Sequence, residues 1–155
     1  MMPRDAQALR PAAEGRLALV FRAAGRLCAL PLEHVVETMR PLPVEPVAGA
    51  PAAVLGAAMV RGEPTPVVDV AMLIDEAAGA RRRFVSARAG RRRVALAVEE
   101  VVGVRALPAA RELPPLFAEG GDRLAAIARL DGELLRVLNA ARLLPDDGAP
   151  ASEVG

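Results

Sequence analysis

The feature of this sequence that most limits how the chain can fold is an internal repeat. The run ALPLEHVV at residues 29–36 lines up with ALAVEEVV at residues 95–102, which begins 66 residues later. Residues 61–74 line up in the same way with residues 131–144, at a spacing of 70. Chance similarity in an Ala-, Val- and Leu-rich chain is the less favoured explanation, because gaps are few and the turn glycines coincide. We therefore expect two similar halves. In the second of these two alignments the identical positions are Gly62/Gly132, Glu63/Glu133, Val67/Val137, Ala71/Ala141 and Leu73/Leu143.

Within each half the hydrophobic pattern is that of β-strands. Apolar residues alternate along 17–22 and 94–98, which predicts half-buried strands. Ala24-Gly25, Ala89-Gly90 and Asp131-Gly132 predict hairpin turns, and Asp131-Gly132 is the strongest signal because both residues tolerate positive φ. Frequent prolines exclude long helices. Only two short helices are expected, at about 71–76 and 140–144.

About five strands per half predict an all-β fold made of two small β-barrels packed together, since a closed barrel leaves no exposed strand edge. We expect a flexible arm at 1–15, a folded region at 16–145 and a flexible tail at 146–155. The folded region divides into a first lobe at about 16–78 and a second at about 82–145. Strands are allowed to exchange between the lobes.

The composition suits a folded protein with almost no net charge. Of the 155 residues, 53% are apolar, enough for a core, and the net charge of +1 gives no general attraction to nucleic acid or acidic membranes. All basic residues are Arg, which excludes lysine Schiff-base chemistry and the phosphate-loop lysine. Neither a signal-peptide pattern nor an apolar run of membrane-spanning length is present, so we expect a cytoplasmic protein that does not insert into membranes.

The sequence offers no catalytic constellation. The single histidine, His34, lies on a strand-like segment without neighbours at metal-ligand spacing. The single cysteine, Cys28, lies between apolar residues, where a buried and inert thiol is the natural interpretation. No dinucleotide, phosphate-loop or nucleophile-elbow motif is present. We therefore expect no enzyme, no metal and no cofactor.

Two arginine triplets, at 81–83 and 91–93, flank a predicted hairpin. One hypothesis is phosphate contact, which would make the chain a small two-barrel nucleic-acid-binding protein using the hairpin between Arg81 and Arg93. The other is a solvated basic edge that discourages pairing with other chains. We favour the second, because only Phe84 is available nearby to stack on a base.

Three motifs in order resemble the chemotaxis coupling proteins, the CheW-like domains. They are ALPLEHVVE at 29–37, GAAMVRG at 56–62 and PVVDV at 66–70. The second half fits through RRVALAVEEV at 92–101 and through 134–144, so the resemblance covers about 17–145. It implies two intertwined SH3-like five-stranded barrels and a non-enzymatic adaptor. The implied partners are the cytoplasmic tip of a chemoreceptor and the regulatory domain of the histidine kinase CheA, in membrane receptor arrays. We expect a free-standing adaptor, and flagellar and pilus pathways both remain open.

The same resemblance assigns residues to the two partners. Receptor contact is implied at Val35, Glu37, Gly56 and Arg61, and kinase contact at Leu116 and Phe117 in a proline-stiffened loop. Structural alternatives stay open.

Val35 is also compatible with the core, Gly56 with a turn, and Phe117 with packing under its own loop. Arg61 has internal pairing with Asp69 or Glu63 as its alternative. Asp69 itself is expected to cap the helix that follows. Met59 stands where the family often has Asn, which removes or replaces a polar contact near the receptor groove.

Overall fold

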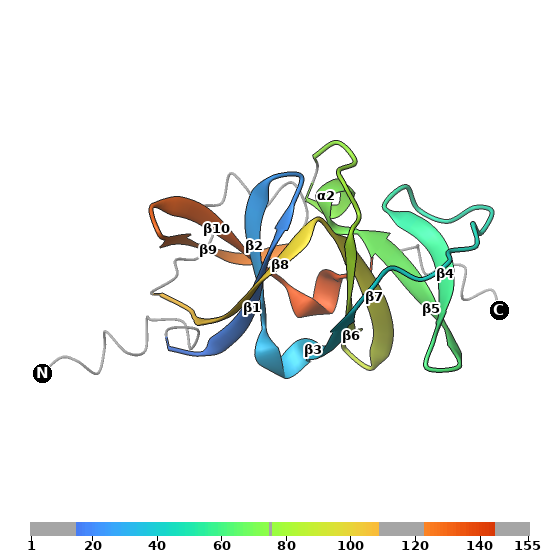
Figure 1. Cartoon of the computed structure of the whole chain (residues 1–155), viewed down its shortest axis with the longest axis horizontal. Coiled ribbons are helices and arrows are strands. Elements are labelled where there is room, and N and C mark those ends of the chain that lie inside the picture. The colour runs from blue at the N-terminus through green and yellow to red at the C-terminus, as the bar shows by residue number, and fades with distance from the viewer. Residues whose placement is uncertain (1–14, 75, 109–122, 145–155) are drawn as a thin grey trace, which may run out of the picture.

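The computed structural model describes residues 15–74, 76–108 and 123–144, and within these ranges its regular secondary structure is almost entirely β-strand (Figure 1). The expected all-β class is confirmed. The elements are β1 (Leu17–Ala23), β2 (Arg26–Pro31), η1 (Leu32–His34), β3 (Val35–Met39), β4 (Val54–Val60), β5 (Glu63–Asp69), α2 (Val70–Leu73), β6 (Arg83–Ala89), β7 (Arg92–Val98), β8 (Glu100–Ala106), β9 (Leu124–Leu130), β10 (Glu133–Leu138) and η2 (Ala140–Arg142).

The strands form two five-stranded sheets, and each sheet draws on both halves of the chain. The first sheet has the order β8-β1-β2-β10-β9 and the second has the order β3-β6-β7-β5-β4. The β1–β2 hairpin of the first half therefore lies between strands of the second half. The β6–β7 hairpin of the second half lies between strands of the first. The two halves, about 16–78 and 82–145, thus do not form separate sheets.

The two sheets repeat each other in register as well as in strand order. Antiparallel pairing matches Ala18 with Pro31 in one hairpin and Phe84 with Ala97 in the other, 66 positions on. The parallel pairing of Val67 with Ala95 has its counterpart in that of Val137 with Ala29. Even the bulges coincide, since the register shifts after Val20 on the β1–β8 pair and after Val35 on the β3–β6 pair, at equivalent points.

The strand-forming segments explain the buried cores. The two central hairpins are buried on both faces, which is why β1, β2, β6 and β7 are almost continuously apolar. One apolar cluster, including Phe21, Leu30 and Leu96, joins the sheets. Smaller clusters lie against one sheet each, around Val20 and Leu135 in the first and around Phe84 and Val67 in the second. The apolar packing on both faces of each central hairpin therefore holds the two halves of the chain together.

Turns and caps follow local sequence rules. Ala24-Gly25, Arg61-Gly62 and Asp131-Gly132 all have positive φ at both positions, as tight two-residue hairpin turns require. Asp69 accepts a hydrogen bond from the Ala71 amide at 3.0 Å, so the expected helix cap is confirmed. Asn139 caps Ala141 in the same way at the equivalent position of the second half. The helices are shorter than expected, at Val70–Leu73 and Ala140–Arg142.

Three charged contacts join elements that are distant in sequence, and the first of them joins the two halves of the chain. Arg22 on β1 forms a two-pronged contact with Glu133 on β10. Arg105 on the edge strand β8 lies 3.3 Å from Asp131 in the β9–β10 turn. Arg26 at the β1–β2 turn lies 3.3 Å from Glu76. None of the helices in the described ranges has the length and apolar character needed to cross a membrane.

One buried polar group in the second sheet predicts a stabilising substitution. Ser86 on β6 is fully buried, and among the described residues its hydroxyl has no hydrogen-bond partner. The equivalent residue of the first sheet is Val20. Because a buried unpaired hydroxyl costs about 1–3 kcal/mol, Ser86→Ala should raise the free energy of unfolding by about 1 kcal/mol. Urea and thermal unfolding measure the change.

Thr65 provides the matched control for Ser86. Its hydroxyl is equally buried but donates to the Glu63 carbonyl at 3.0 Å. Thr65→Val removes a satisfied hydroxyl and should lower stability by about 1 kcal/mol. If both variants shift stability in the same direction, the assignment of Ser86 as an unpaired group is wrong.

Candidate partner-binding surface

The β4–β5 hairpin presents an arginine at its tip. Arg61 occupies the first turn position with φ 51°, and Gly62 follows with φ 83°. Non-glycine residues adopt this left-handed conformation at some cost, so the turn constrains the Arg61 backbone closely. The Arg61 side chain is 73% exposed. The hairpin therefore places a guanidinium group in solvent at one end of the second sheet.

Arg61 is held by Glu37, a residue that the sequence assigned to the same site. Its Nε donates to Oε2 of Glu37 at 2.9 Å and its Nη2 donates to Oε1 at 2.6 Å. Glu37 lies on β3, at one edge of the sheet, whereas the hairpin of Arg61 includes the opposite edge strand β4. The second sheet must curl for this contact to form. The ion pair, which we call the Arg61–Glu37 clasp, thus joins its two edges.

The clasp changes the electrostatics of both residues. Hydrogen bonding from Arg61 lowers the pKa of Glu37, and the nearby Arg93 adds to this shift. The pKa of Arg61 is raised by the same hydrogen bonds. Glu37 therefore stays ionised and Arg61 stays charged across the neutral range. The alternative partners considered for Arg61 are wrong, since Asp69 accepts instead from Nε of Arg81 at 2.8 Å.

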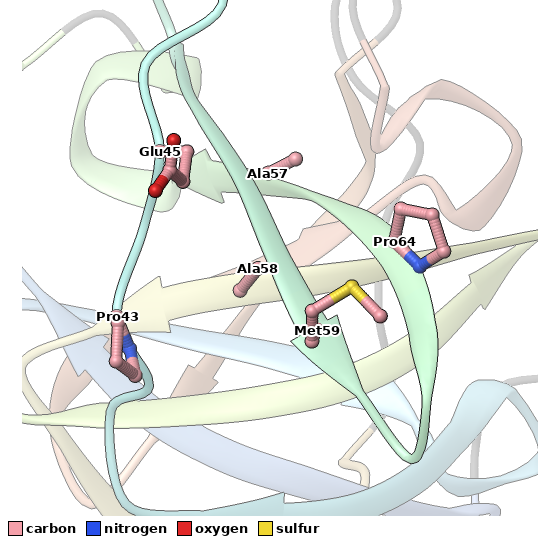
Figure 2. A pocket seen from close by; sticks show the side chains of 6 residues that line it. All are labelled: Pro43, Glu45, Ala57, Ala58, Met59 and Pro64. Atoms are coloured by element: carbon pink, nitrogen blue, oxygen red, sulfur yellow. The ribbon is translucent and has the colours of Figure 1, made fainter.

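An apolar hollow lies on β4 beside the clasp. It encloses about 300 Å³ and is bounded by prolines, alanines, a methionine and one acid: Pro43, Glu45, Ala57, Ala58, Met59 and Pro64. Figure 2 shows the Met59 side chain extending toward Pro64, while Pro43 and Glu45 come from the segment that crosses β4. Met59 is 60% exposed. A hollow of this size and lining can take an aliphatic side chain from a partner.

Gly56 makes the crossing of that segment possible. Its φ is 146°, and a Cβ placed there would lie 2.0 Å from the Glu45 carbonyl oxygen. The approach is fixed by two hydrogen bonds between Glu45 and Ala57, at 2.8 and 2.9 Å. The close backbone approach expected at Gly56 is thus made by the chain itself. Direct contact of Gly56 with a receptor stays a prediction.

The remaining assigned residues lie in different surroundings. Val35, at the start of β3, is half-buried and packs against the core between the sheets. Val35 lies on the same strand as Glu37 and packs that strand against the core. Leu116 and Phe117 lie outside the described residues. Sequence reasoning missed Pro43, Glu45 and Pro64, and only the unusual Met59 pointed toward the hollow.

The single cysteine and the single histidine lie in different surroundings. Cys28 is buried, and this burial raises its pKa to about 12, so the thiol stays protonated at neutral pH. His34 lies 3.4 Å from Glu33 at the surface. Within the ranges that the structure describes, no group of three or more His, Cys, Asp or Glu side chains is arranged to hold a metal.

Comparisons with known proteins agree with this architecture. The family model for the CheW-like domain matches residues 17–148. Protein FrzA of Myxococcus xanthus is 29% identical over 133 residues, covering 80% of this chain and 82% of FrzA. The crystal structure of scaffolding protein TtCheW from Thermoanaerobacter tengcongensis superimposes with a TM-score of 0.77 at 19% identity, covering 86% of this chain and 95% of that one. This last similarity concerns the fold.

The crowding at Gly56 predicts an unusually costly substitution. Gly56→Ala must push the segment containing Glu45 away from β4, in addition to straining the backbone. Gly103 on β8 is the matched control, because its φ is 142° and a Cβ there meets nothing within 4 Å. Gly103→Ala should cost about 1 kcal/mol for the backbone alone. Gly56→Ala should cost a further ~1–3 kcal/mol. Equal losses of unfolding free energy for the two variants, measured with urea, would mean that the segment containing Glu45 moves away from β4 at no cost.

The clasp predicts a stability difference that depends on pH. Because the folded-state pKa of Glu37 is lowered, its stabilisation is present above the ordinary value of 4.5 and is lost as pH falls through the folded pKa. Wild type should therefore have a higher melting temperature than Glu37→Gln at neutral pH, and the gap should shrink as the pH falls below 4.5 and through the lowered pKa of Glu37. Glu133, whose pKa is lowered by Arg22, should behave likewise. A gap that is constant with pH would contradict the ionic contribution.

Proposed function

This chain belongs to the CheW-like domain family of chemotaxis scaffold proteins, and from that premise we propose that it is a non-enzymatic adaptor coupling chemoreceptors to the histidine kinase CheA. The observation that carries the receptor half of the proposal is the Arg61–Glu37 clasp beside an apolar hollow. The kinase half rests on the family resemblance and on Leu116 and Phe117, which lie outside the described residues.

The clasp suits Arg61 for contact with a carboxylate on the partner. A guanidinium has five N–H donors, and Glu37 engages Nε and Nη2. The remaining N–H groups face solvent and are available for a second acceptor. Since Glu37 fixes the orientation of the guanidinium before binding, less side-chain entropy is lost when the complex forms. Glu37 then acts as the positioning residue and Arg61 as the contact.

The hollow supplies the apolar part of the contact. A receptor helix laid along β4 would insert an aliphatic side chain between Met59 and Pro64. Glu45 lies at the rim, and its carboxylate has no hydrogen bond or ion pair with the rest of the described chain. It would therefore select a basic residue on the partner and fix the register of the helix.

We also infer that each five-stranded sheet is curled into an SH3-like barrel. Two contacts support this. The clasp joins β3 to the β4–β5 turn, and the Arg105–Asp131 pair joins β8 to the β9–β10 turn at the corresponding edges of the first sheet. Recruitment from the cytosol to membrane receptor arrays follows from the proposed partners. The buried, protonated thiol of Cys28 supports the absence of enzymatic activity.

The nucleic-acid hypothesis for the hairpin between Arg81 and Arg93 finds less support. Phe84, the aromatic residue considered for base stacking, is 2% exposed and belongs to the core of the second sheet. Arg81 is engaged by Asp69. A stacking platform beside the arginines is therefore lacking in the described part of the hairpin.

The adaptor proposal predicts that one charge reversal separates the two partners. Arg61→Glu removes the donor and sets a second carboxylate against Glu37, so binding to a receptor-tip fragment should weaken at least about tenfold. Binding to the kinase regulatory domain should remain near wild type. Calorimetry with each partner separately gives both affinities. Phe117→Ala should show the opposite pattern.

Arg129→Glu is the control for charge reversal. Arg129 is exposed on β9 at the position equivalent to Met59, on the other sheet. It should leave receptor binding unchanged. If Arg61→Glu lowers both affinities together with the melting temperature, Arg61 is a structural residue. If wild type binds no receptor fragment, the adaptor proposal fails.

A further inference from the structure

The tip of the β6–β7 hairpin carries four arginines. Arg88 lies directly opposite Arg93 in the register of the hairpin, and Arg91 and Arg92 form the tip beside them. Arg88, Arg91 and Arg92 are exposed and Arg93 is half-exposed. Across the described ranges, none of the four has an ion pair with an acid, although the charge of Arg93 is felt at Glu37. Like charges directly across a strand pair oppose folding, so this arrangement costs stability.

The equivalent hairpin of the first sheet is neutralised from within the chain. Arg22, the counterpart of Arg88, is bound by Glu133. Arg26, the counterpart of Arg92, lies 3.3 Å from Glu76. Leu27 stands where the second hairpin has Arg93, so no like-charge pair arises. The same fold therefore satisfies its arginines at one hairpin and leaves them unpaired at the other.

The unpaired arginines lie at the same end of the second sheet as the clasp. Strands β5 and β7 are parallel neighbours, and each begins directly after its hairpin turn. The β4–β5 and β6–β7 tips therefore point the same way, as Figure 1 shows at the lower side of the molecule. The charge of Arg93 contributes to the lowered pKa of Glu37, and Glu37 is itself bound to Arg61 at the other tip. A partner seated at the hollow and on Arg61 would reach the arginine tip.

We propose that the β6–β7 tip binds an acidic segment of the same receptor helix that occupies the hollow, an inference that rests on the proposed function. Directly opposed residues such as Arg88 and Arg93 have Cβ atoms about 4.5–5.5 Å apart. Acidic residues one turn apart on a helix have a similar Cβ spacing of about 5–6 Å. One helix face can thus present two carboxylates to the two guanidinium groups.

A protein partner fits the tip better than a membrane or a nucleic acid. Ala87 and Ala89, the apolar residues next to the tip, are buried, so no apolar side chain is available there to insert into lipid. Phe84 is buried too, which leaves no base-stacking group on the described hairpin. The tip offers charge alone, beside an apolar hollow of side-chain size.

The test is Arg88→Glu in the full chain, with Arg129→Glu as the control of equal charge change. Arg88→Glu converts an Arg–Arg pair into a Glu–Arg pair, so its melting temperature should equal or exceed that of wild type. Binding is measured against the cytoplasmic fragment of each chemoreceptor of the same organism, from low to high NaCl. Arg88→Glu should weaken binding about tenfold at low salt, with the difference shrinking as salt rises. Arg129→Glu should bind as wild type does.

The outcomes separate this inference from the adaptor proposal. Receptor binding by wild type with equal affinity for Arg88→Glu would overturn the inference alone. Absence of receptor binding by wild type would overturn both. Vesicles with and without anionic phospholipid and a short duplex DNA serve as further probes. Binding to either one that is lost in Arg88→Glu, while receptor binding is retained, would assign the tip to that ligand and overturn the inference.

Discussion

The rest of this structure depends on one constraint, namely that each central hairpin is hydrogen-bonded on both sides by strands from the other half of the chain. β1–β2 lies between β8 and β10, and β6–β7 lies between β3 and β5. Neither half can complete a sheet by itself, so each sheet needs residues from both ends of the described chain. The position of the Arg61 turn relative to β3 is fixed by the same exchange, because β6 and β7 separate the strands that carry Arg61 and Glu37. The geometry of the clasp and the folding of the sheets are therefore inseparable here.

The two sheets repeat each other in strand order and register, so the positions at which they differ are informative. Both sheets join a hairpin turn to the opposite edge strand by an ion pair, but with reversed polarity, Arg61 to Glu37 in one and Asp131 to Arg105 in the other. Both sheets thus have an ion pair between a turn and an edge strand, but the turn residue is positive in one sheet and negative in the other. Met59, exposed beside the hollow, has Arg129 as its counterpart. The fold itself therefore tolerates either polarity in this ion pair.

Local chemistry made much of the fold predictable. The Asp131-Gly132 turn and the cap at Asp69 depend on residues adjacent in sequence, and both lie where the pattern placed them. The partner of Arg61 was not predictable in this way. Glu37 is 24 residues away, on a strand that approaches only because the sheet curls. The reason for Gly56 was likewise hidden, because the Glu45 carbonyl that requires a glycine comes from an irregular segment without periodicity. Contacts across the sheet depend on curvature, which residue patterns do not encode directly.

The two hairpin tips differ because, in the described part of the chain, acidic side chains reach the arginines of the first hairpin but not those of the second. In the first sheet the strand adjacent to the hairpin, β10, starts with Glu133, and its carboxylate reaches across β2 to Arg22. In the second sheet β5 starts with the equivalent Glu63, which is exposed and forms no ion pair with Arg88 within the described residues. The acid on the edge strand, Glu37, is already committed to Arg61. Holding Arg61 in place therefore engages a carboxylate that feels the charge of Arg93. Because Glu37 pairs with Arg61, the guanidinium of Arg61 is held in place and the arginines of the β6–β7 tip are left without an acidic partner among the residues that the structure describes.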